Sequence, residues 1–172
     1  SAYANALGMQ ERGNESLAAA ERAATLRQRH AAGDPLEQIE AEHDLGVGQY
    51  RTQDTAMAEQ HWRKTLALAT GVARPPPRTL QTVLNAHQSL ASMLVADGRG
   101  HEAQELMARA LAYADRHGLP ADSPWRVQLL RSQSEVASQR GDGVESEAII
   151  RRAIALQSST IRDDGSTNGK LY

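Results

Sequence analysis

The 172-residue chain contains no cysteine and no phenylalanine, and aromatic residues make up only 3% of it. Without cysteine, neither disulfides nor thiolate zinc sites can form, so the cysteine content does not indicate a cellular compartment. The apolar residues are mainly alanine and leucine. These residues suit closely packed helices and do not suit a β-sandwich, so the composition favours an all-α chain.

Strong net charge and long apolar runs are also missing. The formal net charge of −2 disfavours a nucleic-acid binder, which usually carries a basic stripe. No apolar run approaches the roughly 18 residues that span a bilayer, and no signal peptide is visible. We therefore predict a cytoplasmic protein without a nucleic-acid or membrane partner. Lys64 and Lys170 are the only lysines among 19 basic residues, which we interpret as the bias of GC-rich bacterial coding.

Amphipathic helical segments separated by turn residues fill most of the chain. The clearest example covers residues 90–111, where apolar residues at helical spacing lie on both sides of a break at Asp97-Gly98. Small residues such as Ala91 and Ala103 recur where two helices of a hairpin would approach closely. This stretch predicts a helical hairpin.

Capping residues mark several helix starts. Asp34 before Pro35 is a favourable N-cap followed by proline at the first helical position, and Ser123 before Pro124 repeats the signal. We expect a turn at Gly13, between helices over 1–12 and 15–30. The sequence thus predicts eight helices in one domain over residues 1–158, with hairpins at about 1–31, 34–72, 78–118 and 123–158. Residues 159–172 are polar and without periodicity, so we expect a disordered tail.

A repeat becomes visible when the hairpins are aligned. Each has a small residue four positions before a larger one, with successive spacings of 40, 45 and 43 residues: Ala18/Arg22, Ala58/Trp62, Ala103/Met107 and Ser146/Ile150. Self-similarity of this kind predicts a solenoid, in which each hairpin buries its apolar face against its neighbours.

The repeat resembles the tetratricopeptide repeat (TPR) family. The residues that carry the resemblance are Leu45-Gly46 and Ala58-x3-Trp62 in the second hairpin, and Leu90-Ala91, Gly98, Ala103-x3-Met107 and Ala110 in the third. The resemblance covers nearly all of residues 3–157, and the long period is similar to the longer-helix variants of bacterial regulators and kinesin light chains. It implies an all-α, right-handed superhelix of four antiparallel hairpins, whose first helices line a concave groove for peptides or partner proteins.

Carried over from the family, the groove positions fall on the first helix of each hairpin. They are Tyr3, Leu7, Gln10, Glu11, His43, Val47, Tyr50, Arg51, Gln88, Ser92, Val95, Arg131, Glu135 and Ser138. Chaperone-binding members hold a terminal carboxylate with a Lys/Asn clamp, and the equivalent positions here carry Tyr3, Leu7, His43 and Val47. We therefore do not expect a receptor for chaperone tails.

Catalytic and metal-binding patterns are scarce. The one metal-like spacing is Glu40-x-x-His43, whereas di-iron bundles need two such motifs and two further glutamates. A solvated, polar groove wall explains these residues better. Neither G-x-S-x-G nor the phosphate-binding G-x-x-x-x-G-K-[ST] occurs. We predict no enzyme activity, no metal and no cofactor.

Two functions are open. The first is a scaffold that binds a protein or peptide in the groove, within a larger bacterial regulatory protein. The second is self-association. Ile149 and Ile154 correspond to Leu106 and Leu111 one repeat earlier, and no further hairpin follows to cover them. We expect both isoleucines to be exposed and to form the surface of a two-fold dimer.

Overall fold

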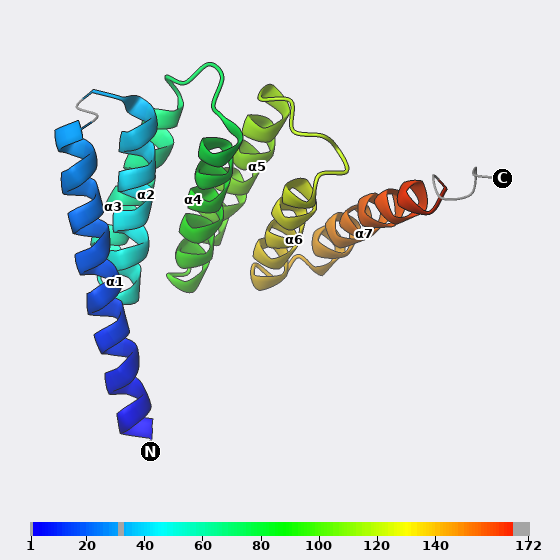
Figure 1. Ribbon diagram of the computed structural model, residues 1–172. Helices are drawn as coiled ribbons and strands as arrows, with labels where there is room; N and C mark the ends of the chain where they lie inside the picture. The colour runs from blue at the N-terminus through cyan, green and yellow to red at the C-terminus, as the bar shows by residue number, and fades with distance from the viewer. Residues whose placement is uncertain (1, 31–32, 167–172) are drawn as a thin grey trace. The chain divides into compact units, whose positions relative to one another are not determined.

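The computed structural model describes the backbone of residues 2–30 and 33–166 and the side chains of residues 12–26 and 33–157. All regular structure in these residues is α-helical, which confirms the predicted fold class (Figure 1). The elements are α1 (Ala2–His30), α2 (Pro35–Arg51), α3 (Thr55–Ala69), α4 (Pro77–Ala96), α5 (Gly100–Arg116), α6 (Pro124–Gln139) and α7 (Gly143–Ser166). The chain divides into two compact units, Ser1–Leu90 and Ala91–Tyr172. Among the described residues, no helix combines the length and apolarity that a bilayer crossing requires.

The predicted helix starts are confirmed at two caps. The Asp34 carboxylate accepts a hydrogen bond from the Leu36 amide at 2.9 Å, and Pro35 occupies the first position of α2. The Ser123 hydroxyl accepts from the Trp125 amide at 3.3 Å at the start of α6. Each cap satisfies an amide that lacks a partner within its helix.

The turns that join α2 to α3, α4 to α5 and α6 to α7 share one backbone geometry, which also ends α5 at Gly118. Residues 53, 98 and 141 all have positive φ, at 67°, 75° and 84°. The amide of the following residue then donates to the carbonyl five residues earlier: Asp54 to Gln49 at 3.0 Å, Arg99 to Leu94 at 2.7 Å and Asp142 to Ala137 at 3.0 Å. This is the Schellman arrangement that ends helices. These turns are separated by 45 and 43 residues, so two of the three predicted spacings recur in the backbone.

Helix α1 is continuous, so the turn predicted at Gly13 is wrong. A glycine inside a helix costs only about 1 kcal/mol relative to alanine, and no proline forces a break there. Gly13 is instead a point of close contact with the end of α2, because an added Cβ would lie 2.6 Å from the Arg51 carbonyl oxygen. The first hairpin therefore does not form, and Tyr3 and Leu7 belong to the same helix as residues 15–30.

In the unit Ser1–Leu90, α2 packs against both α1 and α3. Trp62 of α3 is 2% exposed and fills the core. Two glycines in α2 allow the close approach: a Cβ on Gly46 would lie 2.6 Å from the Trp62 ring, and one on Gly48 would lie 2.9 Å from the Leu17 Cα in α1.

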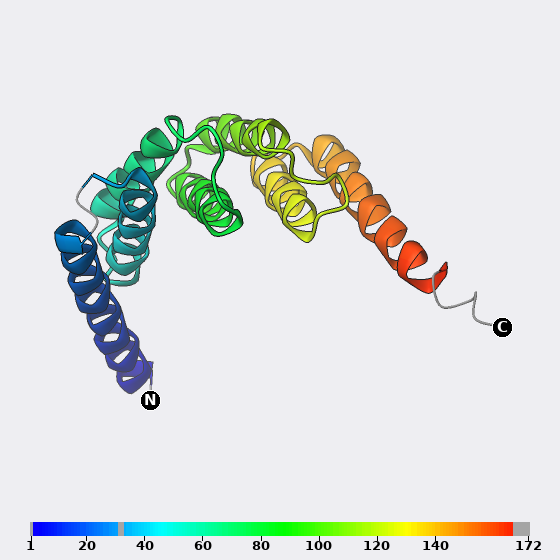
Figure 2. The same cartoon turned by 45° about the horizontal axis from the view of Figure 1, so that its top comes forward.

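In the unit Ala91–Tyr172, α6 packs against α5 and α7. Figures 1 and 2 both show α6 and α7 as antiparallel neighbours joined by a short turn. Their core contains Val127, Leu130 and Ala153, with Leu111, Ile149, Ile150 and Leu156 packed against it. The exposure expected for Ile149 is therefore not found, whereas Ile154 is 56% exposed.

Helix α7 continues to Ser166, beyond the end that we predicted near residue 158. No glycine or proline occurs between 158 and 164 to stop it. The rest of the predicted tail, residues 167–172, lies outside the described residues.

A buried arginine organises the connection between α5 and α6. Arg126 is 8% exposed, and its guanidinium donates to the Leu119 carbonyl at 2.8 Å and to the Pro120 carbonyl at 3.2 Å. It also pairs with Asp115 at 2.6 Å. These charge-assisted bonds fix the loop against both helices.

Candidate interaction surfaces

The predicted groove residues of α2 lie near its C-terminal end. The Tyr50 ring is 47% exposed and packs against the buried Trp62 ring, with centroids 5.6 Å apart. The exposed Arg51 donates a hydrogen bond from its guanidinium to the Ser16 hydroxyl at 3.0 Å. Val47 and His43 are half-buried. The α2 surface, defined as Val47, Tyr50 and Arg51, thus presents an aromatic ring on a rigid support beside a cation.

The other predicted groove positions are distributed over three helices. The side chains of Tyr3, Leu7, Gln10 and Glu11 lie outside the described residues. On α4, Gln88 is half-buried and Ser92 is exposed one turn later. On α6, Arg131, Glu135 and Ser138 are exposed and line one hollow.

The α6–α7 hollow has a volume of about 620 Å³. Its lining consists of Gln128, Arg131, Ser132, Ser134, Glu135, Ser138 and Gln139 from α6, with Ser146 and Ile150 from α7. We predicted Arg131, Glu135 and Ser138 as surface positions but did not predict the wall from α7. In the sequence, the repeat alignment that pairs Ser146 and Ile150 with Ala103 and Met107 was the one indication that these two residues face α6.

The chemistry of the hollow is polar. The Ser134 hydroxyl donates to the Ser146 carbonyl oxygen at 2.9 Å and lies 2.9 Å from the Ser146 hydroxyl. Gln139 donates to the Glu135 carboxylate at 3.4 Å. Arg131 has neither a hydrogen-bond nor an ion-pair partner in the described part of the chain. An open guanidinium and an exposed carboxylate therefore lie one helical turn apart.

A second hollow, of about 250 Å³, lies at the turns of the same unit and includes Arg140 in its lining. The Arg140 guanidinium donates to the Gln104 side-chain carbonyl. Gln104 in turn donates to Glu145 at 2.9 Å, and Arg140 lies 3.6 Å from the same carboxylate. This network joins α5, the end of α6 and the start of α7, and we assign it a structural role.

Glu40 of the Glu40-x-x-His43 spacing is 9% exposed, so the solvated groove wall that we predicted there is wrong for this residue. The Thr82 hydroxyl lies 3.0 Å from both oxygens of the buried Glu40 carboxylate and donates to it, and Arg78 lies 3.5 Å away. These contacts attach α2 to α4. Within the described ranges, no group of three histidine or carboxylate side chains is placed to hold a metal ion.

Burial shifts two titrating groups at the end of α5. It raises the pKa of Tyr113 above the ordinary 10.0, while the charge of Arg116 acts in the opposite direction. Burial lowers the pKa of His117 below 6.5, and Arg116 lowers it further. The two rings contact each other with centroids 4.3 Å apart. Both shifts favour the neutral forms, so this pair is suited to packing.

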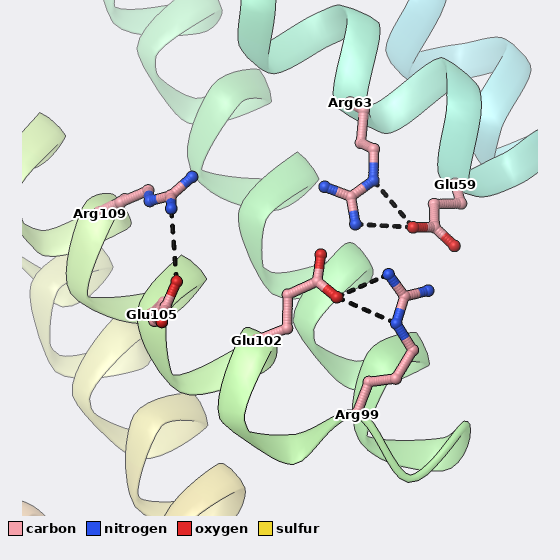
Figure 3. A network of polar contacts seen from close by, with 6 residues as sticks. All are labelled: Glu59, Arg63, Arg99, Glu102, Glu105 and Arg109. Atoms are coloured by element: carbon pink, nitrogen blue, oxygen red, sulfur yellow. Dashed lines mark hydrogen bonds and ion pairs between the residues drawn. The ribbon is translucent and has the colours of Figure 1, made fainter.

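Surface ion pairs do not create a further charged site. Figure 3 shows Arg63 turned toward Glu59 on α3, and Arg109 turned toward Glu105 on α5, at 2.7 and 3.5 Å. At the start of α5, Arg99 lies 2.6 Å from Glu102. Each is a local pair three or four residues apart, and exposed pairs of this kind contribute about 0–1 kcal/mol.

Comparison with solved structures identifies the fold. BtubC (BKLC) from P. vanneervenii superposes with a TM-score of 0.67 at 20% identity, covering 84% of this chain. The fold is TPR-like. The chain spans 56% of the length of BtubC. A putative kinesin light chain from Podosopora anserina, whose own TPR-like repeats are nearly identical to one another, matches with a TM-score of 0.43 at 14% identity. The match covers 88% of this chain and 90% of that one. Neither family models nor curated proteins match the chain.

Proposed function

We propose that this chain is a scaffold that binds a protein segment on the α2 surface, without catalysing a reaction. A TPR-like fold is generally non-catalytic and typically mediates protein interactions. The observation that carries the proposal is the half-exposed ring of Tyr50, which packs against the buried Trp62 and is next to Arg51 in sequence. Tyrosine and arginine dominate binding hot spots, because they bury large areas and form directional bonds. We place the scaffold within a larger bacterial regulatory protein of the cytoplasm.

Photocrosslinking tests this function. A photoreactive phenylalanine analogue at position 50 should capture the partner in the host cell, whereas the same group in place of the exposed Arg109 should not. With the captured partner purified, Tyr50→Ala/Arg51→Ala should weaken its binding at least about tenfold. Arg109→Ala is the matched control and should bind like the parent. Unchanged affinity of the double variant, with normal helicity by circular dichroism, would contradict the proposal.

A further inference from the structure

Three residues that line the α6–α7 hollow correspond to buried residues one repeat earlier. Ser134 and Ser146 align with Ala91 and Ala103, which are 1% and 0% exposed. Ile150 aligns with Met107, which is also 0% exposed. Ser134 is buried as well, at 7% exposure, whereas Ser146 and Ile150 are half-buried and line the hollow.

The side chains on the open face have changed from apolar to hydroxyl-bearing. Serine occupies the positions of Ala91, Val95 and Ala103, and Ser134 and Ser146 hydrogen-bond each other. An apolar segment placed here would leave polar groups without water or partners, which is unfavourable. A matching surface must therefore bring its own hydrogen-bonding groups. Serine and glutamine side chains both donate and accept, so a face rich in them can match a copy of itself.

The charges of the hollow are also self-complementary. Arg131 and Glu135 lie four residues apart on α6, which places their Cβ atoms about 5–6 Å from each other on one side of the helix. When two α6 helices lie antiparallel across a two-fold axis, Arg131 of each copy faces Glu135 of the other. Isologous interfaces require this kind of reciprocity.

We propose that the α6–α7 hollow is the interface of a two-fold homodimer, in which antiparallel α6 helices form two reciprocal Arg131–Glu135 ion pairs. Ile150 lines the hollow, and Ile154 lies one turn further along α7 with 56% of its surface exposed. These two residues give the polar interface an apolar margin. Of the two predicted dimer residues, Ile154 remains exposed, whereas Ile149 packs, like Ile150, against Val127, Leu130 and Ala153. This proposal is independent of partner binding at the α2 surface.

Charge reversal tests the reciprocal pairing. The parent chain should dimerise in sedimentation-velocity experiments over a concentration series, and its concentration-dependent mass yields a dissociation constant. Arg131→Glu and Glu135→Arg should each weaken self-association at least about tenfold, because each places like charges opposite each other twice. An equimolar mixture of these two variants should associate one-to-one, since every charge then meets its opposite. The double variant Arg131→Glu/Glu135→Arg should dimerise like the parent.

The control is Arg109→Glu, which reverses an exposed charge on α5 and should leave the dissociation constant unchanged. All changed side chains are exposed, so circular dichroism should show parental helicity throughout. A parent that is monomeric at all concentrations overturns the proposal. Single reversals that dimerise like the parent, or a mixture that fails to associate, also overturn it. Failure in these experiments leaves the crosslinking result at position 50 unaffected, so the two proposals can be rejected separately.

Discussion

Replacing Gly48 with alanine probes how closely α1 and α2 approach. Gly48 is buried in the last turn of α2, and an added Cβ would lie 2.9 Å from the Leu17 Cα and 3.0 Å from its Cδ1. The nearest atom belongs to the backbone of α1. A change of rotamer cannot relieve that clash, so the two helices must move apart.

Two opposing effects decide the size of the change. Alanine is favoured over glycine inside a helix by about 1 kcal/mol, whereas overpacking a core costs about 1–3 kcal/mol. Because the clash is with backbone, we expect a cost in the upper part of this range and a net loss of about 1–2 kcal/mol. The matched control is Gly143→Ala, at the start of α7, where no atom lies within 4 Å of the new Cβ. That substitution should be neutral or slightly stabilising.

Urea denaturation followed by circular dichroism measures both variants. The midpoint should fall for Gly48→Ala and hold or rise for Gly143→Ala. Adding Leu17→Ala to Gly48→Ala should not restore the midpoint, because the new methyl group at position 48 still meets the backbone of α1 in the double variant. If Gly48→Ala is as stable as the parent, the helices do not approach as closely as we describe and the reasoning fails.

Substitutions at three further positions test other parts of the fold. Gln53→Gly should raise the unfolding free energy by about 1 kcal/mol, because Gln53 has a φ of 67° that glycine adopts without strain; an unchanged melting temperature would contradict this. Arg126→Ala should lower stability by about 2–3 kcal/mol through lost charge-assisted bonds, and Arg126→Lys should recover only part of it in the same melting assay. His117 has a pKa below 6.5 in the fold, so the unfolded chain binds its proton more readily. The contribution of neutral His117 to the unfolding free energy should therefore be fully present above pH 6.5 and decline as the pH falls below it. His117→Gln should flatten the dependence of the unfolding free energy on pH, measured by urea titration.

The elements that sequence predicts well depend on chemistry within one or two turns of chain. Asp34 before Pro35 and Ser123 before Pro124 begin helices because a side chain satisfies an amide two residues away. Gly98 and Gly141 end helices because their φ values favour glycine. In these cases the deciding atoms are close in sequence, so inspection of the sequence is sufficient.

The errors arise where the deciding contact is distant in sequence. Gly13 looked like a turn, but its role depends on the Arg51 backbone at the end of α2. Ile149 looked exposed, but its burial depends on how α7 is rotated against Val127 and Leu130 of α6. The same rotation determines the second wall of the hollow. Family spacing predicted surface positions for Arg131 and Glu135, whereas the repeat alignment marked Ser146 only as an equivalent of Ala103 and did not show that it faces the same hollow.

Each of the two compact units contains one of the two tryptophans, Trp62 in Ser1–Leu90 and Trp125 in Ala91–Tyr172. Trp62 is 2% exposed, whereas Trp125 is half-buried. The fluorescence of a shielded indole lies at shorter wavelength and moves to longer wavelength when water reaches the ring. Trp125→Phe would leave Trp62 as the single emitter, reporting the loss of structure around α2 and α3. Comparison with the helical signal of the whole chain would then show whether the two halves unfold together or one after the other.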